Sequence, residues 1–485
     1  MNAPIRRLSM VVAALFCALL VSTTWIQFVQ AKTLHDRPDN RRTLLASYSR
    51  ERGAILVDGE PVAKSVPTKD ELKFVRTYPK GKLYSQVTGY YSFTYGAGGG
   101  IEGAEDALLS GSSDKLFYRR VVDMLTGKVQ SGASLELTIN PAAQRAADEA
   151  LGNQRGAVVA LDPRTGAILA MVSHPQYNPA SLASHDLKSV QAAWKALNND
   201  PGRPAVNRAI AGDLYPPGST FKLVTAAAAL SSGKYTEDSV VPGPASLNLP
   251  LTTTDLPNDD GLPCGPGNQS TLTRALERSC NSTFGGLGLK IGAGALRTQA
   301  AKFGFGDVLR VPMRVSPSSV PDKLNPPQLA QSAIGQYDMR VTPLQMAMVS
   351  AAIANRGVVM SPYLVKTVRG SNLDVIDRTS PEQLSQAVSP DVAAQLTRMM
   401  EKVVTSGTGT AAQIPGVSVA GKTGTAQHAK GAAPHAWFTS FAPADDPKVA
   451  VAVVVEDGGN VGNEAFGGRV AAPIARDVIK AVIGR

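Results

Sequence analysis

A long apolar run near the N-terminus, from about Met10 to Val29, constrains the fold of this chain more than any other feature. A helix of about twenty residues crosses the roughly 30 Å hydrocarbon core of a bilayer. Arg6 and Arg7 precede the run, and positive charge of this kind stays on the cytoplasmic side. We therefore expect residues 1–9 to form a cytoplasmic tail, residues 10–30 a single transmembrane anchor, and the remainder to lie outside the membrane.

A cleaved signal peptide is the alternative interpretation of this run. The residues Val29-Gln30-Ala31 resemble a small-residue cleavage site, and cleavage there would leave a chain that begins at Lys32. The apolar core of a signal peptide is usually about 7–15 residues long, which is shorter than this run. The length favours an anchor that is retained, and both alternatives export the rest of the chain.

Composition and charge narrow the class of protein. The chain has 485 residues, of which 43% are hydrophobic and 18% are charged, and this is typical of a folded protein with more than one domain. The formal net charge is +10, but lysine and arginine never occur in runs longer than a pair. Because nucleic-acid binding needs a clustered basic patch, we expect no nucleic-acid partner.

Only two cysteines, Cys264 and Cys280, lie in the part that we expect outside the membrane, where conditions are oxidising. They could form one disulfide, although the sequence does not give their separation in space. No C-x-x-C pair or Cys/His cluster indicates zinc. We expect neither a metal nor another cofactor.

Two folded units are expected after the anchor. Residues 33–150 read as a small mixed α/β module, in which a strand ends in an Asp58-Gly59 turn and residues 96–100 form a flexible loop. The second unit, residues 151–485, begins with a hairpin over 156–172 and continues with mostly helical patterns to about residue 398.

The end of the second unit returns to strands over 417–420, 436–441 and 448–455, before a closing helix over 471–483. Strands, then helices, then strands describe an α+β domain with one mainly antiparallel sheet.

One short stretch of the second unit suggests chemistry. Pro216, Pro217 and Gly218 form a turn immediately before Ser219, and an Ala- and Leu-rich run with high helix propensity follows. We expect Ser219 near a helix N-terminus, with Lys222 one turn later on the same face. The helix dipole and burial would both disfavour a protonated amine there, so a base would lie beside a nucleophile. A capping serine and an exposed lysine would give the same short pattern.

Two later stretches make the pattern specific. Ser279-Cys280-Asn281 lies between helical runs, and Lys422-Thr423-Gly424-Thr425 follows an apolar strand. Alone, each would be an ordinary cap, turn or strand end. S-x-x-K, a serine-asparagine motif and K-T-G in this order are the motif set of penicillin-binding proteins and class A β-lactamases. The chain resembles a class B penicillin-binding protein, and most of all the mycobacterial and actinobacterial A type.

The resemblance covers nearly all of residues 40–485 and implies a fold and a reaction. The fold is a β-lactamase/transpeptidase-like domain over 151–485, with an antiparallel sheet and a helical subdomain, behind a non-catalytic dimerisation or pedestal-like domain over 33–150. The reaction is D,D-transpeptidation of peptidoglycan stem peptides, in which Ser219 is acylated and an amine of a second stem completes the cross-link. β-Lactams would acylate the same serine.

The resemblance also assigns roles to site residues. Ser219 is the nucleophile, Lys222 its base, Ser279 a proton relay, and Lys422 the group that tunes this relay. The substrate-binding residues are Asn281, Thr423, Gly424 and Thr425. The backbone N–H groups of Ser219 and Thr425 would form the oxyanion hole, and Gly424 would let a ligand approach the strand edge closely.

Partners implied by the resemblance are a SEDS-type glycan polymerase and other division or elongation proteins. Three alternatives remain open: a D,D-carboxypeptidase or a β-lactamase of the same fold, and a non-enzymatic β-lactam sensor or scaffold. We find no acidic motif placed to activate a deacylating water, and we expect His428 and His435 on the surface. Residues 416–423 match a phosphate-loop pattern, but no helix follows them, so we expect no nucleotide site.

Overall fold

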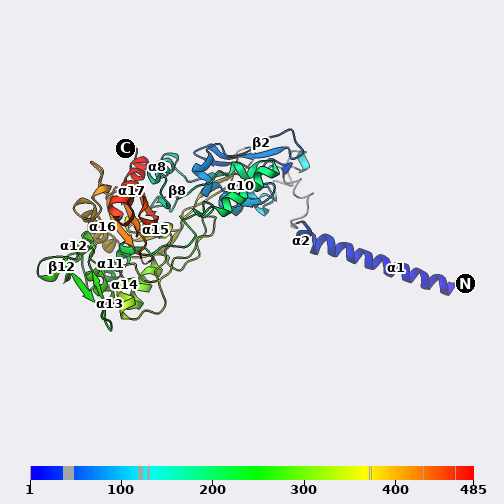
Figure 1. The fold of residues 1–485 in the computed structure, drawn as a ribbon. Helices are drawn as coiled ribbons and strands as arrows, with labels where there is room; N and C mark the ends of the chain where they lie inside the picture. The colour runs from blue at the N-terminus through cyan, green and yellow to red at the C-terminus, as the bar shows by residue number, and fades with distance from the viewer. Residues whose placement is uncertain are drawn as a thin grey trace.

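The computed structural model describes residues 2–35, 48–117, 124–127, 131–370, 372, 374–429, 431–464 and 466–485. Figure 1 shows a folded body from which one N-terminal helix extends. Residues 36–47, which the sequence assigns to the N-terminal module, lie outside the described ranges.

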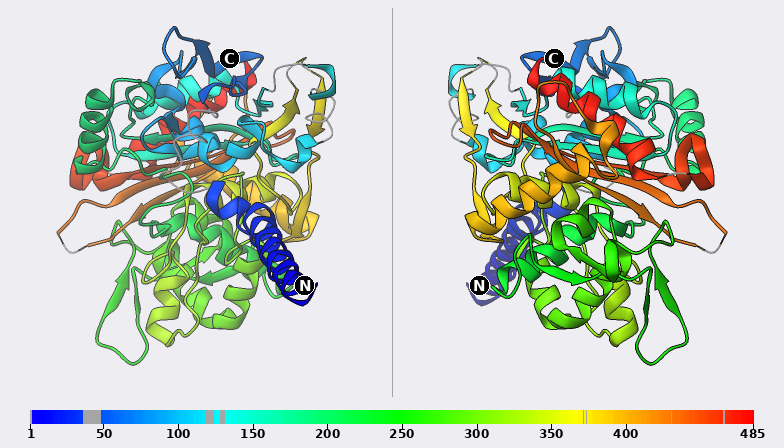
Figure 2. Two further views of the ribbon diagram at one scale, coloured as in Figure 1. Left: turned by 90° about the vertical axis from the view of Figure 1, so that its right-hand side faces the viewer. Right: turned by 90° about the vertical axis from the view of Figure 1, so that its left-hand side faces the viewer.

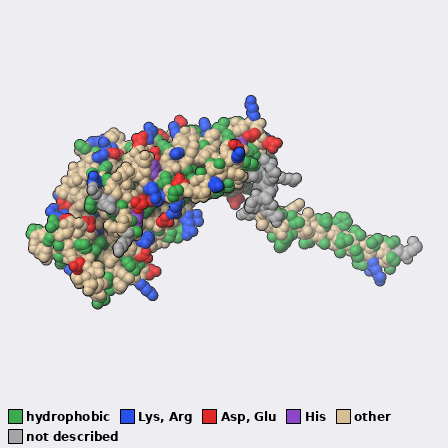
Figure 3. Space-filling view, viewed as in Figure 1, with side chains coloured by type: hydrophobic (Ala, Val, Ile, Leu, Met, Phe, Trp, Pro, Cys, Tyr) green, Lys and Arg blue, Asp and Glu red, His purple; other side chains and the backbone are tan. Residues whose placement is uncertain are grey.

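The N-terminal helix consists of α1 (Asn2–Thr24) and the π-helical turn η1 (Trp25–Val29), followed by the short helix α2 (Ala31–His35). Residues Ala3–Val29 are long and apolar enough to cross a membrane, with a mean hydropathy of 2.1, and a signal sequence would meet the same criteria. Apolar side chains cover much of the helix in Figure 3. The expected tail over residues 1–9 is itself helical from Asn2, because extending a formed helix costs little.

The N-terminal domain contains a six-stranded sheet in the order β15-β14-β6-β1-β2-β3. Its strands are β1 (Ile55–Val57), β2 (Glu60–Pro67), β3 (Phe74–Thr77), β6 (Ser134–Leu137), β14 (Val365–Arg369) and β15 (Val375–Arg378). The expected Asp58-Gly59 turn joins β1 to β2. Strands β14 and β15 come from the second half of the chain, so this sheet is not complete within residues 33–150.

Smaller elements fill out this domain: α4 (Ser85–Thr88), β4 (Tyr90–Ser92), β5 (Gly96–Gly98), α5 (Gly100–Ala104) and α6 (Asp106–Leu109). The expected flexible loop over 96–100 is wrong, because its first three residues pair with β4 and its last residue begins α5. Helices α9 (Ala180–Ala183) and α10 (Leu187–Asn199) also pack here, with Trp194 stacked on Tyr95. α9 lies against β3 and β4, and α10 packs on α9.

The catalytic domain is built on a five-stranded antiparallel sheet in the order β17-β18-β19-β7-β8. Its strands are β7 (Gly156–Leu161), β8 (Ile168–His174), β17 (Ala420–Ala426), β18 (His435–Ala442) and β19 (Val449–Val455). The prediction of one mainly antiparallel sheet is confirmed. β17 is the edge strand, and the K-T-G motif lies within it rather than after a strand over 417–420.

Helices cover both faces of this sheet. Alternate residues of β19 enter two cores: Ala450, Ala452 and Val454 face one, and Val449, Val451, Val453 and Val455 face the other. This follows from the two-residue period of a strand. Helices α17 (Gly467–Ile483) and α8 (Pro141–Leu151) pack on the second face, and α15 (Pro343–Ala354) packs on the first.

A helical subdomain adjoins the α15 side of the sheet, and Figure 2 shows its green ribbons on one side of the orange and red strands. Its helices are α11 (Lys222–Ser231), α12 (Leu272–Glu277), α13 (Asn281–Lys302), α14 (Pro326–Ser332) and α16 (Pro390–Thr405). α11 is buried from Lys222 to Leu230, and its alanines let α13 and α16 pack against it.

Short strand pairs interrupt the region that the sequence assigns to helices. They are β9 (Val240–Pro242) with β12 (Gln269–Thr271), β10 (Ser246–Asn248) with β11 (Asp255–Pro257), and β13 (Val358–Met360) with β16 (Gln383–Gln386). Each of these strands has only three or four residues, which is too short for a periodic pattern to appear in the sequence.

Candidate active site

The expected nucleophile, Ser219, lies in a buried 3-10 turn at the start of α11. The turn, η4, spans Gly218–Phe221, and Lys222 begins the α-helix. Gly218 has a φ of +53°, and a Cβ there would approach Thr425 O to 2.7 Å, so the turn requires glycine at its entry. Ser219 lines a cavity of about 540 Å³. Its hydroxyl makes no hydrogen bond with another described residue, so it is open to a reaction partner in that cavity.

Hydrogen bonds hold the residues before Ser219 against the sheet. Trp437 Nε1, on β18, donates to Pro216 O at 3.1 Å. Gly218 N donates to Gly335 O at 2.9 Å. Because Pro216 and Pro217 also restrict their own φ angles, the nucleophile is fixed in space relative to β17 and β18.

Lys222 is fully buried, and its amine reaches the serine-asparagine motif instead of the Ser219 hydroxyl. Lys222 Nζ donates to Ser279 O at 2.6 Å, to Asn281 Oδ1 at 2.7 Å and to Ser279 Oγ at 3.3 Å. These acceptors occupy the amine of Lys222. The direct contact between Lys222 and Ser219, expected because they are three residues apart on a helix, is therefore not formed. Burial lowers the pKa of Lys222 to about 7, although Asp259 acts in the opposite direction.

Lys422 is the second buried amine and lies on the other side of Ser279. Its Nζ donates to Ser279 Oγ at 2.8 Å and to Thr423 O at 2.9 Å. Burial, and then the neighbouring Lys222, lower the pKa of Lys422 well below its ordinary value. Ser279 Oγ therefore accepts hydrogen bonds from two buried amines whose charged forms are both disfavoured.

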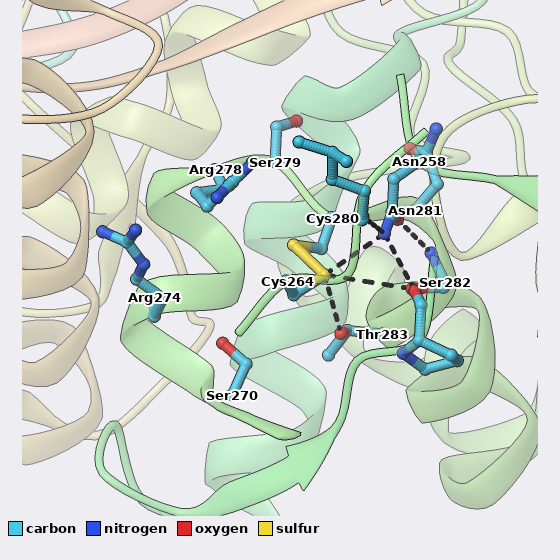
Figure 4. Close-up of a disulfide and its surroundings, with 12 residues drawn as sticks. Asn258, Cys264, Ser270, Arg274, Arg278, Ser279, Cys280, Asn281, Ser282 and Thr283 are labelled. Carbon is cyan, nitrogen blue, oxygen red and sulfur yellow. Dashed lines mark hydrogen bonds between the residues drawn. A yellow bond between two sulfur atoms is a disulfide. The ribbon is translucent and has the colours of Figure 1, made fainter. Parts of the chain in front are cut away.

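The turn between α12 and α13 presents Ser279 in a left-handed conformation, with a φ of +61°. The next residue, Cys280, forms a disulfide with Cys264. Figure 4 shows Asn258, Ser282 and Thr283 gathered around the Cys264 sulfur, and Asn258 Nδ2 donates to it at 3.4 Å. The disulfide thus joins the turn that carries Ser279 and Asn281 to the loop that precedes Cys264.

The K-T-G strand presents its free edge to the cavity, which Thr423, Gly424 and Thr425 line. The structure adds a second reason for glycine at position 424 to the close approach of a ligand that the sequence suggests. A Cβ on Gly424 would approach Trp437 Cβ to 2.9 Å and Thr220 Cγ2 to 3.0 Å. The missing side chain therefore makes room for the nucleophile turn as well as for a ligand.

Residues outside the three motifs also line the cavity, among them Asp259, Thr408 and Phe466, and no pattern in the sequence indicates them. Thr408 Oγ1 is 2.6 Å from Thr423 Oγ1. Asp259 Oδ1 accepts a hydrogen bond from Asn281 Nδ2 at 2.9 Å. The sequence shows no acidic motif for a deacylating water, and Asp259 is an acidic side chain at the cavity that belongs to no motif. A single aspartate in a loop has no pattern from which its position could be read.

His428 and His435 do not line this cavity. His435 lies on β18 and is buried, contrary to expectation, and burial lowers its pKa to about 4. Its ring stacks on that of His428 with centroids 3.9 Å apart and an interplanar angle of 10°. With Asp457 the two form a group of metal-ligand type, in which His435 Nδ1 already accepts a hydrogen bond from Asp457 N at 3.1 Å.

Comparison with known proteins agrees with this geometry. Residues 156–480 match the penicillin-binding protein transpeptidase domain, and residues 52–135 match the penicillin-binding protein A dimerisation domain. The chain is 45% identical to the peptidoglycan D,D-transpeptidase PbpA of Mycolicibacterium smegmatis, over 100% of this chain and 99% of that protein. It is 44% identical to PbpA of Mycobacterium tuberculosis, with the same coverage.

Solved structures give the same relationship. The ceftriaxone acyl-enzyme complex of M. tuberculosis penicillin-binding protein A has a TM-score of 0.86 and 44% identity to this chain. The penicillin G acyl-enzyme complex of that protein has a TM-score of 0.85 and 44% identity. Each alignment covers 90% of this chain and 100% of the solved chain. Motifs, fold and full-length similarity together place this chain in the penicillin-binding protein transpeptidase family.

Proposed function

We propose that this chain is a serine D,D-transpeptidase that cross-links peptidoglycan stem peptides through an acyl-enzyme on Ser219. One observation carries most of the argument. The Ser279 hydroxyl lies between two buried amines, Lys222 and Lys422, beside a turn that leaves the Ser219 hydroxyl open to the cavity. This arrangement provides a nucleophile, a base and a proton relay within one water-poor site.

Acylation begins when Ser219 Oγ attacks the carbonyl carbon of the penultimate D-Ala. Neutral Lys222 takes the hydroxyl proton, for which its amine must turn from one of its acceptors on Ser279 and Asn281 toward Ser219 Oγ. Its pKa of about 7 makes the neutral form available near physiological pH. The backbone N–H groups of Ser219 and Thr425 stabilise the oxyanion. The leaving amine of the terminal D-Ala receives a proton through Ser279, which Lys422 supports from the other side.

Substrate binding is assigned to the free edge of β17 and to Asn281. The terminal carboxylate of the stem lies against Lys422, Thr423 and Thr425, where hydroxyl groups and an amine donor are available. The hydroxyl of Thr423 is oriented by Thr408. Asn281 orients the peptide group of the stem, for which its amide must release one of the contacts it makes to Asp259 and Pro257 O.

Mass spectrometry of the protein after treatment with benzylpenicillin tests the nucleophile. We expect one covalent adduct, on a peptide that contains Ser219, and none in Ser219→Ala. An adduct on another residue, or the absence of any adduct on the native chain, would contradict the proposal.

The stability of that adduct distinguishes the alternatives within the fold. A transpeptidase should retain the penicilloyl group for hours, whereas a β-lactamase should lose it within milliseconds. A scaffold or sensor predicts that Ser219→Ala complements a deletion strain, and the proposed enzyme predicts that it does not.

We further propose that α1 remains in place as a single membrane anchor, which puts the catalytic domain on the outer side. Its length supports an anchor more than a signal sequence. N-terminal sequencing of the membrane-bound protein tests this, and a start at Lys32 would exclude it. An anchored chain would share a bilayer with the SEDS-type glycan polymerase and the division or elongation proteins that the family resemblance suggests as partners. Crosslinking in membranes would detect such contacts.

A further inference from the structure

Asp259 places an exposed carboxylate in the wall of the cavity that contains Ser219. One of its oxygens, Oδ1, accepts a hydrogen bond from Asn281 Nδ2, and Asn281 Oδ1 accepts one from Lys222 Nζ. The carboxylate is thus linked through a single amide to the base of the reaction. A carboxylate has about four acceptor positions, so Asp259 can accept further donors from the cavity.

The loop that carries Asp259 is held firmly. The preceding residue, Asn258, is 5% exposed, and its amide donates to Pro244 O at 2.9 Å and to Leu262 O at 2.8 Å. Its Oδ1 accepts from Ser282 N at 3.0 Å, which joins the loop to α13. The Cys264–Cys280 disulfide closes the same loop onto the Ser279 turn. The position of the carboxylate is therefore fixed by hydrogen bonds within the loop, by its contact with α13 and by the disulfide.

The stem peptide that acylates Ser219, the donor stem, has no positive group at its reacting end to pair with Asp259. The reacting end of the donor stem offers a carbonyl, an amide and a terminal carboxylate, and a second carboxylate would repel the last of these. Asp259 does influence both Lys222 and Lys422 electrostatically, and in each case it favours the protonated amine. The group that a carboxylate at this place should attract is therefore another amine.

The second half of the reaction brings in such a group. The acceptor is an amine, and an alkylamine is protonated in neutral water because its ordinary pKa is about 10.4. Moving an ammonium ion into a cavity beside two lysines is unfavourable unless an anion compensates it.

We propose that Asp259 binds the ammonium group of the acceptor stem and holds it beside the acyl-enzyme on Ser219. This inference rests on the proposed transpeptidase function. The bound ammonium loses one proton to solvent or to neutral Lys222. The free amine then attacks the acyl carbon, a C–N bond forms, the C–Oγ bond breaks, and the second amine proton returns to Ser219 Oγ. Asp259 positions the amine and does not itself take a proton.

The substitution Asp259→Asn separates this role from a merely structural one. Asparagine keeps an oxygen that can accept from Asn281 Nδ2, while the charge is removed and the second oxygen becomes an NH2 donor. Asp255→Asn is a matched control, because Asp255 lies nearby on β11 and also accepts from an asparagine amide, Asn248 Nδ2, at 3.1 Å. Asp255 does not line the cavity.

The assay uses the full chain, a D-Ala thioester donor whose acyl group contains no amine, and Nα-acetyl-D-lysinamide as the acceptor. A natural donor stem could itself bring an ammonium group to Asp259 on a diamino residue. Because this donor has no amine, the acceptor is the substrate that supplies the ammonium group. We measure the ratio of aminolysis to hydrolysis and the KM for the acceptor, together with acylation by benzylpenicillin, which needs no acceptor.

In Asp259→Asn we expect the acceptor KM to rise about tenfold and the aminolysis ratio to fall accordingly, as when one charge-assisted contact is lost. The fall should exceed any change in acylation by about that factor, and Asp255→Asn should match the native chain. Equal losses of acylation and aminolysis would overturn the proposal and leave Asp259 as a residue that only positions Asn281. A defect confined to amine-bearing donors would also overturn it. Failure of the native chain to acylate would instead contradict the proposed function.

Discussion

This molecule contains two buried clusters of basic side chains, and they differ in how their positive charge is balanced. In the N-terminal domain, Arg52 and Arg76 both pair with Glu102, at 2.7 and 2.6 Å. In the catalytic domain, Lys222 and Lys422 meet at the Ser279 hydroxyl, and no carboxylate of the described residues hydrogen-bonds to either amine. In the first cluster carboxylates balance the positive charge, and in the second cluster burial disfavours the protonated amines.

The pKa values express this difference. Burial alone would raise the pKa of Glu102, but Arg76 and Arg52 outweigh it and hold that pKa below its ordinary value. Burial lowers the pKa of both lysines, and Asp259 opposes this only in part. A buried ion pair that is complete serves structure, whereas a buried amine without a paired carboxylate is a base ready for chemistry. Four predictions test the contrast.

The largest effect should come from removing the amine of Lys222. In Lys222→Met we expect acylation by benzylpenicillin to fall by about 10³-fold or more, because a general base contributes about 10²–10⁴. Thermal stability should change little, because methionine removes the cost of burying an amine but leaves Ser279 O and Asn281 Oδ1 without this donor. Stopped-flow acylation and a melting curve measure the two quantities, with the exposed Lys234→Met as the control. A large loss of stability with little loss of acylation rate would mean that Lys222 serves the structure rather than the chemistry.

The converse experiment removes the carboxylate of the other cluster. In Glu102→Gln we expect a loss of about 3–5 kcal/mol in the free energy of unfolding, because Arg76 loses the carboxylate it pairs with and Arg52 keeps only the half-exposed Asp106. Denaturant titration measures the loss. The rate of acylation per folded molecule should stay close to that of the native chain. A variant that unfolds no more readily than the native chain would show that the Glu102 charge is not needed.

The third prediction concerns how the rate of acylation depends on pH, which reports on the Lys222 and Lys422 cluster. Lys222 acts as a base only when neutral, so the rate should rise with pH, reach half its maximum near pH 7 and level off above about pH 8. The unfolded chain keeps this lysine protonated up to its ordinary pKa of 10.5, so the native chain should gain stability between pH 7 and pH 10.5. Lys222→Met should lose part of that gain. An acylation rate that falls as pH rises through 7 would contradict the assignment of the base.

The smallest effect should come from Asp106, which also pairs with Arg52 but is half exposed. Solvent screens such a pair, so Asp106→Asn should cost less than about 1 kcal/mol. Denaturant titration alongside Glu102→Gln measures it. Equal losses in the two variants would mean that burial does not decide which carboxylate matters.

The catalytic site could be predicted from sequence because three short motifs carry it in a fixed order. Lys222 and Lys422 meet at the Ser279 hydroxyl, Ser219 and Ser279 line one cavity, and the Cys264–Cys280 pair is joined. The dominant helices, the final strands and the antiparallel sheet follow from periodicity and turn residues.

The features that were missed depend on contacts between distant residues. Nothing local in Val365–Arg369 indicates that it pairs with Ser134–Leu137. Asp259 is one aspartate in a loop, and only the fold brings it to Asn281. His435 is buried because β18 lies inside the sheet, which its neighbours in sequence do not reveal.

The shared six-stranded sheet also sets an order of events during synthesis. The N-terminal domain is the first part of the body to be made, yet its sheet cannot be completed until β14 and β15 have been made, after most of the catalytic domain. Until then β6 has an unpaired edge that invites wrong pairing. The sheet of the N-terminal domain therefore stays incomplete while the catalytic domain forms. We expect the N-terminal domain to be the last part of the molecule to become resistant to protease.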